Sequence, residues 1–103
     1  MTLIETLFSE MCADMDKFTA LMDRDDFLGT VEERDLDARI NALALVIAVT
    51  PAITEADASI KLAALSRRSY GTVHDAHDIM RGVDETEAAL IAGYLKDVRA
   101  LAA

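Results

Sequence analysis

The same helix-start signal occurs at four places in this chain, and an apolar pattern with helical spacing follows each of them. In each signal, a Thr or Asp oxygen can accept a hydrogen bond from a first-turn backbone N–H that has no partner within the helix. An acid three residues later can reach back to the cap amide and suits the positive end of the helix dipole. The signals are Thr2 with Glu5, Thr30 with Glu33, Thr54 with Asp57 and Asp84 with Glu87. This repetition predicts an all-α fold.

Two apolar stripes define the first two predicted helices, residues 3–24 and residues 31–49. In the first, apolar side chains recur at alternating steps of four and three residues, which places them on one face. Its members are Ile4, Phe8, Met11, Met15, Phe18 and Met22. The members of the second are Leu36, Ile40, Leu43 and Ile47. Gly29 suits the left-handed position after a helix end, so the connection is short and the two helices are expected to be antiparallel neighbours.

The second half of the chain predicts two more helices. Thr50-Pro51 ends the second helix, because Pro cannot continue the backbone hydrogen bonds. The third helix begins after Thr54, and its apolar face continues past Gly71 to about Arg81. Since Gly costs about 1 kcal/mol in a helix interior, the third helix is either long or kinked or broken near Gly71. The fourth helix follows Asp84, and its stripe is Ile91, Tyr94, Leu95, Val98 and Leu101, with Leu90 beside it.

These elements predict one domain. The length of 103 residues fits a single small domain, and a hydrophobic content of 52% supplies one core. We therefore expect residues 1–103 to form an antiparallel four-helix bundle. Cys12 is the one cysteine, so no internal disulfide can form. It lies at the edge of the first apolar face, and no basic residue close in sequence lowers its pKa, which favours a partly buried hydrophobe over a reactive thiol.

The charge of the chain limits its partners. A net charge of −9 repels nucleic-acid phosphates and anionic lipids, so we expect no direct binding to nucleic acid or to a membrane. No signal peptide is visible, and the longest apolar run, residues 42–49, is too short to span a bilayer. We therefore predict a soluble cytoplasmic protein. The acidic corner at residues 23–37 lacks the glycine and the acid that a calcium-binding EF-hand loop requires, so it is interpreted as a solvated turn.

Residues 42–49 of the second predicted helix are apolar on every side. A helix that is apolar all round is buried all round. Leu45 and Val49 point away from the stripe of Leu43 and Ile47, so they need a second partner. The simplest explanation is a two-fold homodimer, and the alternative is a central helix that the third and fourth helices cover. The predicted interface residues are Ala42, Leu45, Val46 and Val49.

The densest polar cluster is residues 73–82, which holds both histidines of the chain. On a helix, His74 and Asp78 share a face, and His77 lies one turn from His74 and from Arg81. One interpretation is structural, with an exposed His74–Asp78 pair and His77 at the edge of the core. A second is a metal site, since His and carboxylate at helical spacing can bind a transition metal. Metal sites in bundles, however, take ligands from several helices, and no Glu-x-x-His pair occurs in this chain.

A third interpretation of the same cluster is phosphotransfer. An acidic four-helix domain with an exposed histidine resembles a histidine-containing phosphotransfer domain, in which any residue, Leu, Lys and Gly follow the phosphorylated His. Here Arg81 and Gly82 each come one position later after His77 than in that motif. One position rotates a side chain about the helix axis by about 100°. The resemblance implies His77 as the phosphoacceptor and Arg81 as the base that steadies the phosphate.

Residues 47–54, followed by Lys61 and Leu62, are similar to a segment of small uncharacterised bacterial helical proteins that share Thr-Pro-Ala-x-Thr. In that pattern an Ala/Gly-rich turn and a Lys follow. This chain departs from it at Ala56-Asp57, where a small residue and Gly are expected. The resemblance implies a bacterial cytoplasmic protein and carries over no functional residue.

No catalytic or cofactor motif is present in the sequence. We therefore predict a non-enzymatic protein-interaction or regulatory module that forms a homodimer, needs no cofactor and binds a protein partner. A phosphotransfer domain that uses His77, and a metal-binding bundle that uses His74, His77 and Asp78, stand as the alternatives.

Overall fold

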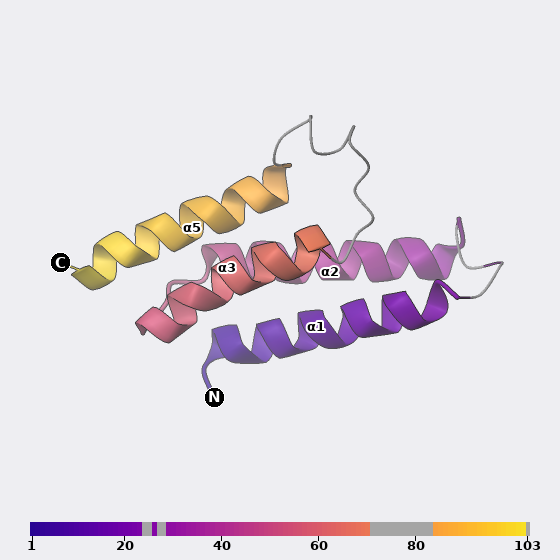
Figure 1. Ribbon diagram of the computed structural model, residues 1–103, viewed down its shortest axis with the longest axis horizontal. Coiled ribbons are helices and arrows are strands. Elements are labelled where there is room, and N and C mark those ends of the chain that lie inside the picture. The colour runs from indigo at the N-terminus through magenta and orange to yellow at the C-terminus, as the bar shows by residue number, and fades with distance from the viewer. Residues whose placement is uncertain (24–25, 27–28, 71–83, 103) are drawn as a thin grey trace.

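The computed structural model describes residues 1–23, 26, 29–70 and 84–102. This part of the chain is all-α, and its helices are α1 (Leu3–Leu21), α2 (Val31–Val49), α3 (Glu55–Tyr70) and α5 (Glu85–Ala102). Figure 1 shows α1 and α2 running side by side in opposite directions, with α3 and α5 forming a second antiparallel pair. The predicted fold class, an antiparallel four-helix bundle, is confirmed for the described residues.

The four predicted helix caps form as hydrogen bonds. In each, the Thr or Asp oxygen accepts from the backbone N–H three residues later, at 2.8–3.2 Å. Two of the acids also reach back, but to the amide before the cap. Glu33 Oε2 accepts from the Gly29 N–H at 2.6 Å, and Asp57 Oδ2 accepts from the Ile53 N–H at 3.3 Å. Gly29 has a φ of +84°, where a residue without a side chain meets no steric penalty.

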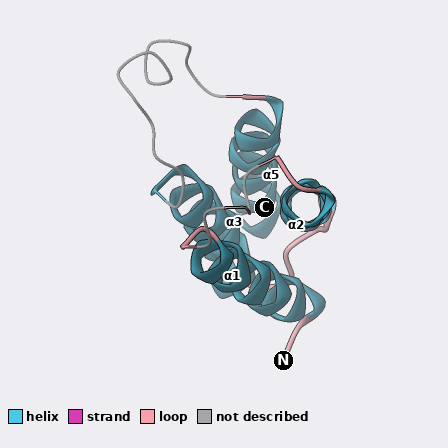
Figure 2. Ribbon diagram, turned by 90° about the vertical axis from the view of Figure 1, so that its right-hand side faces the viewer, coloured by secondary structure: helices cyan, strands magenta, loops and turns pink. Residues whose placement is uncertain are grey.

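The helices follow the order α1, α2, α5, α3 around the bundle. Helix α2 packs along both α1 and α5, and α3 packs along α5 and against α1. In the described part of the chain, α1 and α5 do not meet, and α2 makes little contact with α3. Figure 2 shows this arrangement nearly end on, with α2 at one edge of the group. The turn from α2 to α3 therefore joins helices that lie across the bundle from each other.

The core is small and draws on every described helix. Its buried residues are Ile4, Met11, Met15, Ile40, Ala44, Ile47, Ala48, Ala64 and Leu90. Full burial of one large aliphatic side chain contributes about 1.5–3 kcal/mol, so this cluster is the main source of stability. The predicted stripes of the first two helices supply most of it. Met22 is the exception, because α1 ends at Leu21 and leaves Met22 44% exposed as its C-cap.

Helix α3 is described only as far as Tyr70. The predicted continuation of the third helix across Gly71 to Arg81 falls within residues 71–83, which lie outside the described residues. Within α3, Ala58 and Ala64 are buried as apolar positions, whereas Leu62 is 39% exposed.

Helix α5 turns a different face inward from the one its apolar stripe predicts. Its buried residues are Leu90 and Asp97, whereas Leu95, Val98 and Leu101 are 37–47% exposed. Gly93 lies on the same face as the buried pair and explains the orientation. A Cβ at Gly93 would lie 2.2 Å from the Ala48 carbonyl oxygen, so only glycine allows α5 to approach α2 this closely. The predicted stripe is therefore turned away from α2, and part of it faces α3.

Candidate functional site

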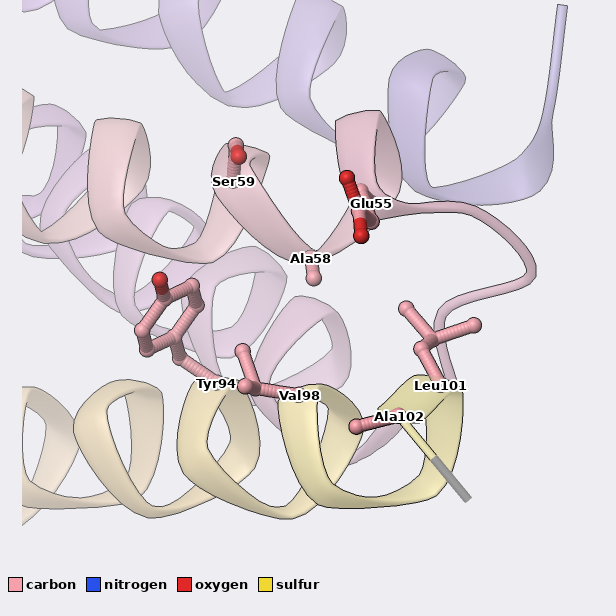
Figure 3. A pocket seen from close by; sticks show the side chains of 7 residues that line it. All are labelled: Glu55, Ala58, Ser59, Tyr94, Val98, Leu101 and Ala102. Atoms are coloured by element: carbon pink, nitrogen blue, oxygen red, sulfur yellow. The ribbon is translucent and has the colours of Figure 1, made fainter.

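A pocket of about 250 Å³ opens between α3 and α5. Figure 3 shows its α3 side, formed by Glu55, Ala58 and Ser59, facing the side chains that α5 contributes. The α5 residues that line the pocket are Tyr94, Val98, Leu101 and Ala102. Three of the lining residues, Tyr94, Val98 and Leu101, belong to the predicted apolar stripe of α5. The stripe thus forms one wall of a hollow instead of part of the core.

Apolar side chains form the floor of the pocket, and three polar groups border it. Figure 3 shows the Tyr94 ring rising from α5 with its hydroxyl toward α3, and the Glu55 carboxylate near the other end. In the described part of the chain, neither Glu55, Ser59 nor Tyr94 makes a side-chain hydrogen bond or an ion pair. Glu55 and Ser59 are exposed and Tyr94 is half-buried, so water can solvate all three and a ligand can reach them.

The pocket carries one charged side chain and lies at the ends of two helices. Glu55 is the one charged side chain among the residues that line it. Leu101 and Ala102 form the last turn of α5, where the free carbonyl groups of a helix carry partial negative charge. Helix α3 presents its amide end near Glu55, but Thr54 Oγ1 already accepts a hydrogen bond from the Asp57 N–H there. Glu55 and the carbonyl end of α5 therefore favour a cationic group, whereas the amide end of α3, where Glu55 itself lies, carries partial positive charge.

A buried ion pair fixes the two helices that line the pocket. Lys61 Nζ of α3 lies 2.5 Å from Asp97 Oδ2 of α5, with 1% and 7% of the side chains exposed. Lys61 Nζ also donates to the Ala48 carbonyl oxygen of α2 at 3.1 Å. Lys61 is one helical turn from Ala58, and Asp97 is one turn from Tyr94. The ion pair therefore sets the spacing of the pocket walls from behind.

Two further contacts hold the ends of this helix pair. At the start of α3, the buried Asp57 accepts a hydrogen bond from the Thr2 hydroxyl at 2.7 Å, which joins α3 to the N-cap of α1. At the start of α5, Arg68 Nη1 donates to Asp84 at 2.8 Å and to Glu87 at 3.1 Å. The first contact fixes the start of α3 against α1, and the second joins the end of α3 to the start of α5.

The predicted interface residues lie on the outer side of α2. Ala42 is exposed, and Leu45, Val46 and Val49 are 42%, 44% and 75% exposed. No described helix covers them, although α2 packs along α1 and α5 on its other side (Figure 2). We refer to Ala42, Leu45, Val46 and Val49 as the α2 outer face. Ile53, in the connection between α2 and α3, is 76% exposed.

The histidine cluster cannot be placed in this architecture. His74, His77, Asp78 and Arg81 lie in residues 71–83, outside the described residues. The phosphotransfer and metal-site interpretations of that cluster therefore stay predictions. Among the described residues, no group of three His, Cys, Asp or Glu side chains could hold a metal ion.

Cys12 and the acidic corner carry no sign of chemistry in the described residues. Burial raises the pKa of the Cys12 thiol above its ordinary value, Arg67 partly offsets this, and Asp16 adds to it. A raised pKa leaves less thiolate, which agrees with the prediction of a hydrophobe and not a nucleophile. In the acidic corner, Glu33 accepts the hydrogen bond from Gly29, and Asp35 and Asp37 are exposed.

Sequence reasoning predicted the apolar stripe that lines one side of the pocket, but neither the pocket nor its supports. Lys61 and Asp97 were not predicted as buried, although the positions of both offered a signal. Lys61 lies between Ala58 and Ala64 on the inward face of α3, and Asp97 falls two turns after Leu90 on α5. One charged residue on the apolar face of each of two helices, with opposite signs, indicates a buried ion pair.

The fold places the chain among all-α proteins with a four-helix, bundle-like arrangement. None of the described helices is both long enough and apolar enough to cross a membrane. Comparison with known protein families, with curated proteins and with solved structures finds no match for this chain. The similarity of residues 47–54 to small bacterial proteins stays a prediction.

Proposed function

We propose that this protein is a non-enzymatic, cytoplasmic interaction module that forms a homodimer through the α2 outer face. One observation carries the proposal: Leu45, Val46 and Val49 are large apolar side chains, and each is more than two-fifths exposed on one side of one helix. Contiguous exposed apolar surface marks interaction sites in soluble proteins.

The spacing of the α2 outer face suits docking against another helix. Its residues follow the steps that place side chains in one line along a helix, and they lie opposite the core residues Ile40, Ala44 and Ile47. Helix α2 therefore has two apolar faces, of which the fold uses one. Burial of the second would add favourable apolar contact at about 25 cal/mol per Å².

The distribution of charge favours a second copy as the occupant. Two copies that each carry a net charge of −9 repel each other over most of their surfaces. Residues 40–54, between Arg39 and Glu55, contain no Asp, Glu, Lys, Arg or His. In a two-fold dimer each patch meets the same patch of its partner, so an uncharged surface is where copies meet without like charges opposite one another.

The test is the solution mass, measured by light scattering after gel filtration over a range of concentrations. We expect the wild-type chain to have the mass of a dimer and the Leu45→Glu/Val49→Glu variant to have the mass of a monomer. Because both residues are already exposed, the variant should keep the helical circular dichroism of the wild type.

A matched control adds the same charge elsewhere. Ala13→Glu/Ala20→Glu changes two exposed residues of α1 and should remain dimeric. A wild-type chain that is monomeric at every concentration would refute the proposal. So would a Leu45→Glu/Val49→Glu variant that remains folded and dimeric.

A further inference from the structure

The pocket between α3 and α5 combines an apolar floor with polar groups that the fold leaves unused. Ala58 is 2% exposed, and Val98 and Leu101 still present more than a third of their surface to the outside. The Glu55 carboxylate and the Tyr94 hydroxyl make no hydrogen bond or ion pair in the described part of the chain. Elsewhere in the same helix pair, buried carboxylates such as Asp57 and Asp97 are paired.

We propose that this pocket binds a small alkylammonium ion, with the ammonium group at Glu55 and the alkyl chain over Ala58, Val98 and Leu101. The site is separate from the α2 outer face, so the proposal does not depend on dimer formation.

The charge of the ligand follows from the charged groups at the pocket. Among its lining residues Glu55 is charged, and no Lys or Arg is present to attract an anion. The carbonyl end of α5 at Leu101 and Ala102 adds partial negative charge on the same side of the pocket as Glu55 (Figure 3). An ammonium group can donate hydrogen bonds to the carboxylate and to these carbonyl oxygens together. A carboxylate or phosphate would meet like charge at each of them.

The size and apolar character of the ligand follow from the floor. The pocket has a volume of about 250 Å³. This space fits a short alkyl chain and is smaller than the usual pocket for a drug-sized molecule. The chain would displace water from Val98 and Leu101, which is favourable in proportion to the apolar area covered. Tyr94 lines the far end, opposite Glu55 (Figure 3).

The test uses n-hexylammonium chloride, titrated at constant ionic strength into the full chain labelled for methyl NMR. We expect saturable shifts of the Val98 and Leu101 methyl resonances. The Val49 methyl resonances on the α2 outer face should stay unchanged, which separates binding in the pocket from adsorption to exposed apolar surface. The isosteric alcohol, n-hexanol, should bind more weakly, and n-hexanoate should not bind.

The Glu55→Gln variant tests the role of the charge. It should weaken n-hexylammonium binding up to about fivefold, the range for an exposed ion pair, and leave n-hexanol binding unchanged. Glu10→Gln removes the same charge from an exposed position on α1 and should change neither affinity. The Val98→Asn variant should weaken binding of both ligands, because it removes part of the apolar floor.

Three results would overturn the proposal. One is equal affinity for the ammonium ion and the alcohol, with no effect of Glu55→Gln. Another is a shift of the Val49 resonances in parallel with those of Val98. The third is a dependence of the Val98 and Leu101 shifts on protein concentration without ligand, since a second copy of the chain would then occupy the pocket.

Discussion

Lys61 and Asp97 form an ion pair inside the bundle, with Nζ 2.5 Å from Oδ2 and 1% and 7% of the side chains exposed. The pair joins α3 to α5, and the hydrogen bond from Lys61 to the Ala48 carbonyl oxygen adds α2. Burial of two charges has a large desolvation cost, so the net contribution of such a pair to stability is small. Its effect is to fix the relative positions of three helices.

Removal of one partner of this pair should lower the stability of the fold far more than removal of both. Lys61→Met or Asp97→Leu alone leaves a buried charge without a partner, which costs about 3–5 kcal/mol of the free energy of unfolding. The double variant Lys61→Met/Asp97→Leu replaces both charges with apolar groups and should recover most of that loss. Urea unfolding followed by circular dichroism gives the free energy of unfolding of the wild type, the two single variants and the double variant. A double variant destabilised by the sum of the two single effects would contradict the coupling.

Gly93 should be intolerant of alanine, although alanine is the better helix former. A Cβ there would lie 2.2 Å from the Ala48 carbonyl oxygen and 3.3 Å from Lys61 Nζ. Overpacking of this kind costs about 1–3 kcal/mol, against a gain of about 1 kcal/mol in helix propensity. Thermal unfolding of Gly93→Ala should therefore show a lower Tm.

The neighbouring exposed position provides the control for Gly93. Ala92→Gly should also lower the Tm, here through lost helix propensity of about 1 kcal/mol. The preference between Gly and Ala thus reverses between adjacent residues of α5. A Gly93→Ala variant that is more stable than the wild type would show that α2 and α5 do not approach so closely.

The parts of the fold that sequence reasoning predicted are local. The Thr30 cap needs only the amide of Glu33, and the stripe of Ile4, Met11 and Met15 needs only the helical repeat. Each can be identified without knowledge of where the other helices lie. The all-α class and the antiparallel pairing follow from such local signals together with a short first connection.

The parts of the fold that sequence reasoning missed depend on residues far apart in the chain. Whether Lys61 is buried depends on Asp97 and on the Ala48 carbonyl, which belong to two other helices. The direction of the α5 stripe depends on Gly93, whose approach to Ala48 turns Val98 out of the core. Periodicity identifies an apolar face but cannot tell whether the fold covers it. For the same reason, the α2 outer face is exposed in the fold, and what covers it stays a proposal.

The stability of the protein should depend on pH through Asp84. Burial raises the pKa of this carboxyl, but backbone hydrogen bonds from Glu87 and Thr86 and the ion pair with Arg68 outweigh it and lower the pKa below 3.8. A carboxyl with a lowered pKa stabilises the fold above its unfolded pKa, and this contribution is lost as pH falls through the folded pKa. Because Asp84 is half exposed, its contribution is below about 1 kcal/mol.

Asp84→Asn isolates this contribution, because Asn remains a good helix cap but carries no charge. The difference in unfolding free energy between wild type and Asp84→Asn should be constant near neutral pH and shrink below about pH 4. Glu85→Gln removes an equal charge one residue away, outside the contacts of Arg68, and should show a smaller change. A difference that does not vary with pH would refute the role of the Asp84 charge.

Cys12 should react slowly with iodoacetamide because its thiol resists ionisation. Burial raises its pKa above 9.0, Arg67 lowers it in part, and Asp16 raises it. The pH at which alkylation reaches half its maximal rate should therefore be higher in the folded protein than in urea. This midpoint separates ionisation from simple shielding, since shielding slows the reaction equally at every pH.

Arg67→Gln should move the midpoint up and Asp16→Asn should move it down, although the two residues form an ion pair with each other. If neither variant moves the midpoint, these two charges do not act on the thiol, and burial alone accounts for its low reactivity.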